Sequence, residues 1–185
     1  DHWALPGGFL LENESPKKAA LRVLKEKAGI SNMYTEQLYT FPGSGRDPRG
    51  NVITISHLAL ALKDKTKIIQ PEKTQTPTFY PIKKSPKLAF DHKKIIDYAL
   101  KRLQSKLEYT NIVYSLLPRF FTLNQLQITY EVILNKHLDK RNFRKKFLML
   151  GLIKQTKKVL KGKRQRPAQL YRFLNHRPAE LKKFF

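Results

Sequence analysis

The spacing of apolar residues predicts a first region that combines one helix with several strands. Residues 16–28 carry an apolar stripe at helical spacing, with Pro16 suited to the first turn and Gly29 suited to the end of the helix. Residues 3–11 predict a short strand and a glycine-rich turn, and two further stretches have the apolar runs and flanking turn residues that are typical of strands: 38–41 and 52–62. Residues 63–90 are rich in lysine, threonine and proline, and we expect an irregular end to this region.

From residue 91 the apolar pattern becomes helical. It predicts a helix that starts near residue 91, followed by three more in residues 111–117, 122–135 and 139–150. Thr122 and Asp139 are suited to cap the third and fourth helices. Two predicted strands, 152–159 and 169–173, then flank a hairpin tip. The pattern therefore predicts an α+β protein with two domains, residues 1–90 and residues 91–185.

Charge is distributed unevenly between these two regions. The sequence has 37 lysine and arginine residues against 14 aspartate and glutamate residues, a formal net charge of +23. Residues 1–90 carry a net charge of +6, and residues 91–185 carry +17. A basic half of this kind favours nucleic acid or an anionic membrane surface as a partner. The absence of cysteine excludes disulfides and thiolate zinc sites, and no apolar stretch approaches the ~20 residues that span a bilayer, so the sequence predicts a cytoplasmic protein.

A regular spacing of glycine, glutamate and arginine stands out near the start of the chain. Gly8 is followed by five residues and Glu14, seven further residues lead to Arg22, and Gly29 closes the segment. This arrangement resembles the Nudix signature, and the preceding residues 3–9 resemble the strand and turn that lead into it. The resemblance implies a Nudix-like mixed sheet with a helix, in a domain that handles phosphate compounds.

The departures from this signature fall on its chemistry. The resemblance implies glutamates at positions 23, 26 and 27, on one helix face, that hold divalent cations and help to activate water for attack on a diphosphate. Here Val23 provides no oxygen, and Lys27 brings a positive charge to the place of a cation, so only Glu26 remains. We expect Glu26 and Lys27 to line a ligand pocket without catalysis. One hypothesis is that Lys27 stands in for a metal ion against a bound phosphate. The alternative is an active Nudix hydrolase of a nucleoside diphosphate derivative, with relocated ligands and a basic accessory domain.

Two arginines lie in the loop before the strand predicted for residues 52–62. The segment Arg46, Asp47, Pro48 and Arg49 resembles the Arg-Asp-Pro loop of Nudix proteins that handle ADP-ribose and related compounds. Either guanidinium is suited to bind phosphate oxygens in a bidentate manner. A solvated turn closed by Asp47 and Pro48 explains the same residues, and both interpretations stay open at this point.

The second region combines a basic helix with a basic hairpin. On helix 139–150, Phe143 and Phe147 cluster with Leu150 on one side, while polar residues lie on the others. The candidates for DNA contact on this helix are Lys140, Arg141, Asn142, Arg144 and Lys145. The hairpin tip adds four candidates for phosphate or minor-groove contact: Lys161, Lys163, Arg164 and Arg166. With helix 122–135 placed as the first member of a helix-turn-helix pair, this order predicts a winged helix-turn-helix domain that binds double-stranded DNA.

Three segments of the second half resemble one family of regulators. Residues 116–123 resemble the approach to the second helix of its winged helix, residues 140–146 its recognition helix, and residues 166–173 the return strand of its wing. With the Nudix-like first half, the chain resembles the NrtR family, the Nudix-related transcriptional regulators of NAD metabolism, over nearly its whole length. The family fold begins with strands upstream of Trp3, so the resemblance implies that part of the first sheet lies outside this sequence.

The resemblance also implies a function. A non-catalytic Nudix-like domain senses ADP-ribose or a related phosphorylated metabolite, and the ligand alters the grip of a homodimer on a palindromic operator, typically releasing it. Relatives control genes of NAD or pentose metabolism, so we predict a repressor of such genes that has no cofactor and no metal. An RNA-binding module is disfavoured because the strands carry no aromatic ladder. A membrane-surface role is disfavoured because the basic helix leaves no broad apolar face after core packing.

Overall fold

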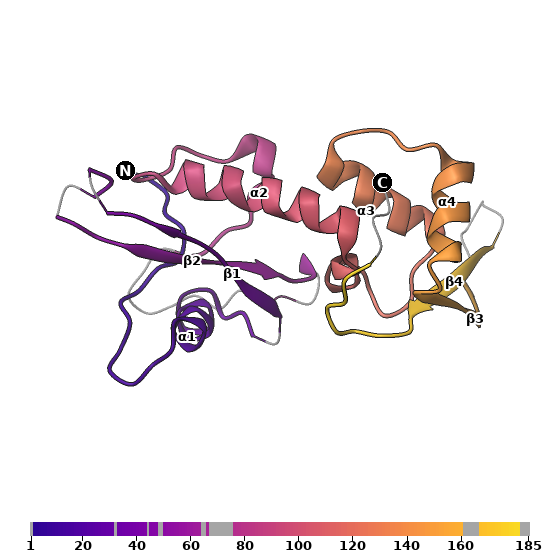
Figure 1. Ribbon diagram of the computed structural model, residues 1–185, viewed down its shortest axis with the longest axis horizontal. Helices are drawn as coiled ribbons and strands as arrows, with labels where there is room; N and C mark the ends of the chain where they lie inside the picture. The colour runs from indigo at the N-terminus through magenta and orange to yellow at the C-terminus, as the bar shows by residue number, and fades with distance from the viewer. Residues whose placement is uncertain are drawn as a thin grey trace. The chain divides into compact units, whose positions relative to one another are not determined.

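The computed structural model describes residues 2–31, 33–43, 45–47, 50–63, 66, 76–160 and 167–181. The chain forms two compact units, Asp1–Ala99 and Leu100–Phe185, and helix α2 (His92–Tyr109) begins in the first unit and ends in the second (Figure 1). The domain boundary proposed from the sequence, at residue 90, follows the change in apolar pattern and lies just before α2. The compact units divide within this helix instead.

In the first unit, helix α1 (Pro16–Ala28) packs against a hairpin of two antiparallel strands, β1 (Tyr34–Phe41) and β2 (Thr54–Leu60) (Figure 1). The helix begins where the Ser15 hydroxyl accepts an amide of the first turn. It ends at Gly29, whose φ of 67° lies in the left-handed region that glycine adopts without steric cost. These bounds confirm the predicted helix. The two strands are also confirmed, although β1 is longer than the predicted 38–41 and β2 is shorter than the predicted 52–62.

The first part of α2 covers the other side of this hairpin. Tyr98 contacts Tyr39 and Phe41 of β1, with ring centroids 4.9 and 6.0 Å apart. Figure 1 shows α1 and α2 on opposite sides of the two strands. The segment between β2 and α2 contains a 3-10 turn, η2 (Ile82–Lys84), within the region predicted to be irregular.

The segment 3–11 does not form the predicted strand. Its one described bridge joins Trp3 to Leu88 in the parallel sense, and no ladder continues through the described residues that follow. Pro6 has no amide hydrogen to donate, and the two glycines after it weaken a strand further, which explains why pairing stops. Trp3 is half-buried and packs edge to face on Tyr80, with the ring centroids 5.2 Å apart.

The second unit contains a helix-turn-helix followed by a hairpin. Its elements after α2 are the 3-10 helix η3 (Ile112–Leu116), helices α3 (Leu123–Leu134) and α4 (Lys140–Met149), and antiparallel strands β3 (Ile153–Leu160) and β4 (Ala168–Phe173). The predicted helices and hairpin strands are confirmed, with one correction. Residues 111–117 were expected to be α-helical but form η3, because Pro118 stops the segment before a longer helix is established.

Aromatic side chains form the core of the second unit. Tyr130 of α3 contacts Phe143 and Phe147 of α4, with ring centroids 5.3 and 5.8 Å apart. Phe173 of β4 contacts Phe147 at 6.4 Å and Phe121 at 5.1 Å. All five side chains are almost completely buried. Because aromatic side chains bury large areas, these contacts hold α3, α4 and the hairpin together as one body.

Thr122 caps α3 through two reciprocal hydrogen bonds. Its hydroxyl accepts the amide of Gln125 at 3.1 Å, and the Gln125 side chain accepts the amide of Thr122 at 2.8 Å. We expect Thr122→Ala to lower the free energy of unfolding of the second unit by about 1 kcal/mol. Urea denaturation followed by circular dichroism measures this change. Asn124→Ala, at an exposed position of the same helix, is the control. We expect it to be neutral or slightly stabilising, and equal losses in both variants would contradict the role of the cap.

Candidate functional site

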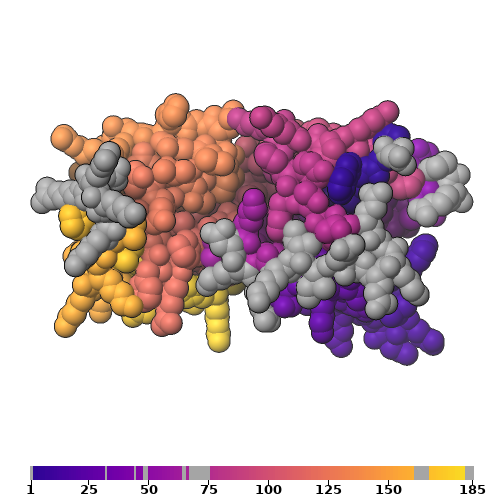
Figure 2. Space-filling model, turned by 180° about the vertical axis from the view of Figure 1, so that it is seen from behind, coloured from indigo at the N-terminus to yellow at the C-terminus, as the bar shows by residue number. Residues whose placement is uncertain are grey.

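Helix α4 presents a basic surface because two aromatic side chains hold its opposite face in the core. Phe143 and Phe147 are buried, and Asp139 begins the helix by accepting the amide of Asn142 at 2.7 Å. Four of the predicted DNA contacts are exposed, as the helical spacing indicated: Lys140, Arg141, Asn142 and Lys145. Figure 2 shows part of the surface of this unit, with the residues of α3 and α4 in salmon and orange.

Arg144 differs from the other candidates on α4. Its side chain is half-buried, and its Nε is buried without a hydrogen-bond partner among the described residues. Together with Asp139, Lys140 and Arg141 it lines an open depression of about 550 Å³. Helical side chains lean towards the N-terminus, so Arg144 reaches back to the turn that carries Lys140. Three cationic side chains that line one open depression are suited to bind an anion.

Two side chains that the sequence analysis missed hold the turn between α3 and α4. Gln127 donates to the carbonyl of Leu138 at 2.9 Å, and Glu131 accepts the amide of Leu138 at 2.9 Å. The bond from Leu138 is the main reason that the pKa of the Glu131 carboxyl is lowered. The available signal was a pair of polar residues four positions apart, and therefore on one face of the helix.

Strands β3 and β4 carry basic side chains, while the predicted hairpin tip lies outside the described residues. The tip residues Lys161, Lys163, Arg164 and Arg166 therefore stay predictions. Within the strands, Lys154 pairs in register with Arg172. The Nζ of Lys158 and the guanidinium of Arg119 lie over the ring of Phe120, 4.3 and 5.5 Å from its centroid. The basic surface thus includes residues of the strands, which the sequence analysis did not single out.

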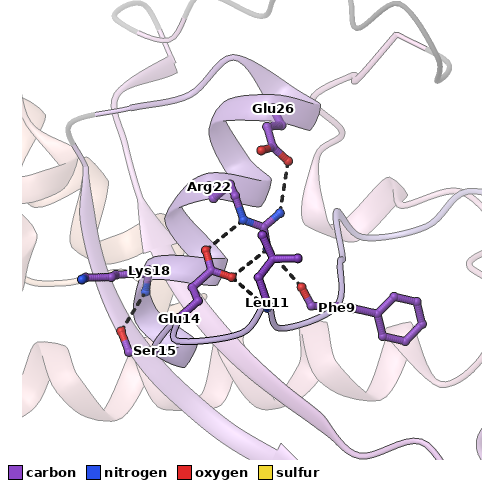
Figure 3. Close-up of polar contacts among 7 residues, drawn as sticks. All are labelled: Phe9, Leu11, Glu14, Ser15, Lys18, Arg22 and Glu26. Carbon is purple, nitrogen blue, oxygen red and sulfur yellow. Dashed lines mark hydrogen bonds and ion pairs between the residues drawn. The ribbon is translucent and has the colours of Figure 1, made fainter.

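In the first unit, Arg22 connects α1 to the loop that precedes it (Figure 3). Its Nε and Nη2 donate to the two carboxylate oxygens of Glu14 at 2.8 and 2.9 Å, and Nη2 also donates to the carbonyl of Phe9 at 3.0 Å. Its Nη1 donates to Glu26 at 3.2 Å. The bond from Arg22 holds the pKa of the Glu14 carboxyl below its usual range. Glu14, just before α1, and Glu26, in its last turn, are therefore both paired with one guanidinium.

The two departures from the Nudix signature have different surroundings. Val23 is buried, and a Cβ on Gly8 would lie 2.7 Å from its Cγ2, so the loop packs closely on α1 only with glycine at this position. The Nζ of Lys27 crosses from α1 to the same loop and donates to the carbonyl of Gly7 at 2.5 Å. Glu26 is exposed. Position 23 therefore packs in the core, while positions 26 and 27 stay close to the loop and to solvent.

Arg46 is engaged within the protein. Its Nε and Nη2 donate to the two oxygens of Asp91 at 3.0 and 2.6 Å, and its Nη1 bonds the hydroxyl of Thr54. The side chains of Arg46 and Asp91 are only 9% and 14% exposed. The sequence did not reveal this ion pair because the partners are 45 positions apart. A ligand phosphate that binds Arg46 has to compete with Asp91, and Arg49 lies outside the described residues.

Other features of the described residues serve the chain itself. His92 at the start of α2 accepts the amide of Leu5 through Nδ1 at 3.0 Å, and its burial lowers the pKa of the imidazole, which favours the neutral form that accepts this bond.

Among the described residues, no group of three histidine or acidic side chains is arranged to hold a metal ion. No helix in the described part of the chain is long and apolar enough to cross a membrane.

Comparison with known proteins places this geometry in a family. Residues 1–99 match the family model of the NUDIX domain, and residues 113–173 match that of the NrtR DNA-binding winged helix domain. The chain is 38% identical over 177 residues to the ADPR responsive transcriptional repressor NtrR of Acinetobacter baylyi. The alignment covers 93% of this chain and 70% of that protein. The chain belongs to the NrtR family of Nudix-related transcriptional regulators.

Solved structures agree with this membership of the NrtR family. The chain is similar to the crystal structure of Shewanella oneidensis NrtR complexed with a 27mer DNA, with a TM-score of 0.81 and 34% identity over 93% of this chain and 80% of that chain. An ADP-ribose pyrophosphatase of Methanocaldococcus jannaschii is 37% identical over 97 residues, 52% of this chain and 56% of that protein. The fold predicted from the sequence, a Nudix-like domain followed by a winged helix-turn-helix domain, is thereby confirmed for this NrtR-family chain.

Proposed function

We propose that the chain is a transcriptional repressor that binds a double-stranded DNA operator as a homodimer and responds to ADP-ribose or a related phosphorylated metabolite. The observation that carries this proposal is the exposed basic face of α4, held by two buried phenylalanines on its other side. The relative from Acinetobacter baylyi is described as an ADPR responsive repressor, and the related Shewanella oneidensis protein was crystallised with DNA. Genes of NAD or pentose metabolism are the proposed targets.

The basic surface has two parts in this proposal. Lys140, Arg141, Asn142, Arg144 and Lys145 of α4 enter the major groove, where arginine recognises guanine and asparagine recognises adenine. The hairpin tip residues Lys161, Lys163, Arg164 and Arg166 contact phosphates or the minor groove. A two-fold dimer presents two copies of α4 roughly 34–36 Å apart, which is one turn of DNA.

The first unit is the proposed sensor. Lys27, Glu26, Arg46 and Arg49 are the proposed contacts to the effector, with the cationic groups directed to its phosphates and Glu26 to its hydroxyls. Ligand binding changes DNA affinity only if the ligand binds the two states of the protein unequally. The usual coupling of about 1–3 kcal/mol corresponds to about 5–150-fold in affinity.

Titration of ADP-ribose against the protein bound to DNA from upstream of its gene tests this proposal. We expect ADP-ribose to weaken DNA binding about 5–150-fold, measured by fluorescence anisotropy of a labelled duplex. Ribose 5-phosphate, which lacks the diphosphate, is the control and should have little effect. If ADP-ribose does not change the affinity for DNA, ADP-ribose is not the effector. If the chain does not bind the upstream DNA at all, the proposal that it is a repressor of that gene is wrong.

An active Nudix hydrolase is the second candidate, because one relative is described as an ADP-ribose pyrophosphatase. We propose that the chain does not catalyse this reaction, since Val23 and Lys27 replace two of the three glutamates that the signature requires. We expect no turnover of ADP-ribose with magnesium in an assay that detects AMP release. Turnover that is lost in Glu26→Gln would establish the hydrolase instead.

A further inference from the structure

The Nudix signature of this chain has a donor set that does not fit a divalent cation. Mg²⁺ takes six oxygen ligands, and a protein that binds it with a phosphate ligand usually provides one or two carboxylates, while water and phosphate provide the rest. Val23 has no oxygen and is buried. Glu14 uses both carboxylate oxygens on Arg22, and Glu26 is bonded to the same guanidinium (Figure 3). A metal ion at the signature would therefore have to compete with Arg22 for both of these carboxylates.

The ammonium group of Lys27 forms a hydrogen bond with a backbone oxygen of the loop, so that this oxygen is not free to bind a metal ion. It donates to the carbonyl of Gly7 at 2.5 Å, which holds it on the loop between Pro6 and Phe9, where the signature begins. A cation brought to this loop would meet the positive charge of Lys27 at short range. Among the described residues Lys27 has no carboxylate partner, and its hydrogen bond to the neutral carbonyl of Gly7 leaves the ammonium charge uncompensated.

We infer that the ammonium group of Lys27 replaces the divalent cation, so that the chain binds the diphosphate of its effector without a metal ion. This inference rests on the proposed function and identifies how the sensor recognises its ligand. The carbonyl of Gly7 positions the ammonium, and two of its three N–H groups stay available for phosphate oxygens. Arg22 supports the arrangement indirectly, because its bonds to Glu14 and Glu26 offset part of the negative charge that would repel an anion near the loop.

Calorimetric titration of the full chain with ADP-ribose, once in excess EDTA and once in millimolar MgCl₂, tests this inference. We expect the same affinity in both buffers. Lys27→Gln should weaken binding about tenfold or more in both, as loss of a charge-assisted hydrogen bond predicts, and Lys27→Arg should retain most of the affinity. Lys25→Gln removes an exposed lysine from the same helix turn and serves as the matched control, with unchanged affinity.

The outcomes separate the inference from the proposed function. Binding that disappears in EDTA and returns with magnesium overturns the inference while it leaves ADP-ribose as the effector. A Lys27→Gln variant that binds like the wild type, with an unchanged melting temperature, also overturns it. If ADP-ribose does not bind in either buffer, inorganic pyrophosphate is the second probe. Metal-free binding of pyrophosphate that depends on Lys27 supports the inference although the effector is wrong, and absence of binding overturns both.

Discussion

Simultaneous replacement of Arg144 and Lys145 by alanine is expected to weaken binding of upstream DNA by about 100-fold or more, with the fold retained. Lys145 is exposed, and the Nε of Arg144 has no partner among the described residues, so neither side chain holds α4 in place. Phe143 and Phe147 do so from the opposite face. The variant therefore removes anion-binding groups and leaves the aromatic core that positions the helix.

Anisotropy titrations of a labelled duplex at several salt concentrations measure this loss. The wild type should show a steep decrease of affinity with salt, and the slope of log K against log [salt] should decrease by about 0.9 for each phosphate contact that the variant loses. Lys17→Ala with Lys18→Ala removes the same charge from exposed positions of α1 and serves as the control. If the α4 variant binds within about threefold of this control, the recognition surface lies elsewhere.

The second unit was largely predictable because its signals are local. Asp139 and Thr122 are cap residues that precede apolar periodicity, and the structure places both at the helix starts indicated by the sequence. Helical spacing also separated buried Phe143 and Phe147 from their exposed neighbours. The exposure of Arg144 was predicted less well. Its half-burial depends on how the side chain lies along the preceding helical turn, whereas helical spacing gives only its angle around the helix axis.

The first unit depends on contacts that sequence spacing does not show. The signature indicated which carboxylates were missing, but not that Arg22 holds both remaining ones, nor that Lys27 bonds a backbone carbonyl. The strand expected in residues 3–11 failed for a related reason. An apolar run becomes a strand only if a partner lies alongside it, and Trp3 finds one bridge to Leu88 among the described residues.

The ion pair between Arg46 and Asp91 is expected to be the largest single polar contribution to the stability of the first unit. Asp91→Asn leaves a guanidinium that is 9% exposed beside an uncharged amide, so we expect a loss of about 3 kcal/mol in the free energy of unfolding. Trp3 is the only tryptophan in the sequence and lies in the first unit, so its fluorescence during urea denaturation reports on this unit. The exposed pair of Lys93 and Asp97 on α2 provides the control, because Asp97→Asn should cost less than about 0.5 kcal/mol.

The same pair predicts how this stability depends on pH. The hydrogen bond from Arg46 lowers the pKa of Asp91 in the folded protein, so the contribution is fully present above the unfolded value of about 4. It is lost as the pH falls below that value and through the lower folded pKa. The difference in unfolding free energy between wild type and Asp91→Asn should therefore be constant from neutral pH to about pH 5 and shrink at more acidic pH. A difference that persists unchanged at the acidic end would mean that the carboxylate charge is not what Arg46 requires, and that Asp91 acts through packing or backbone geometry at the start of α2.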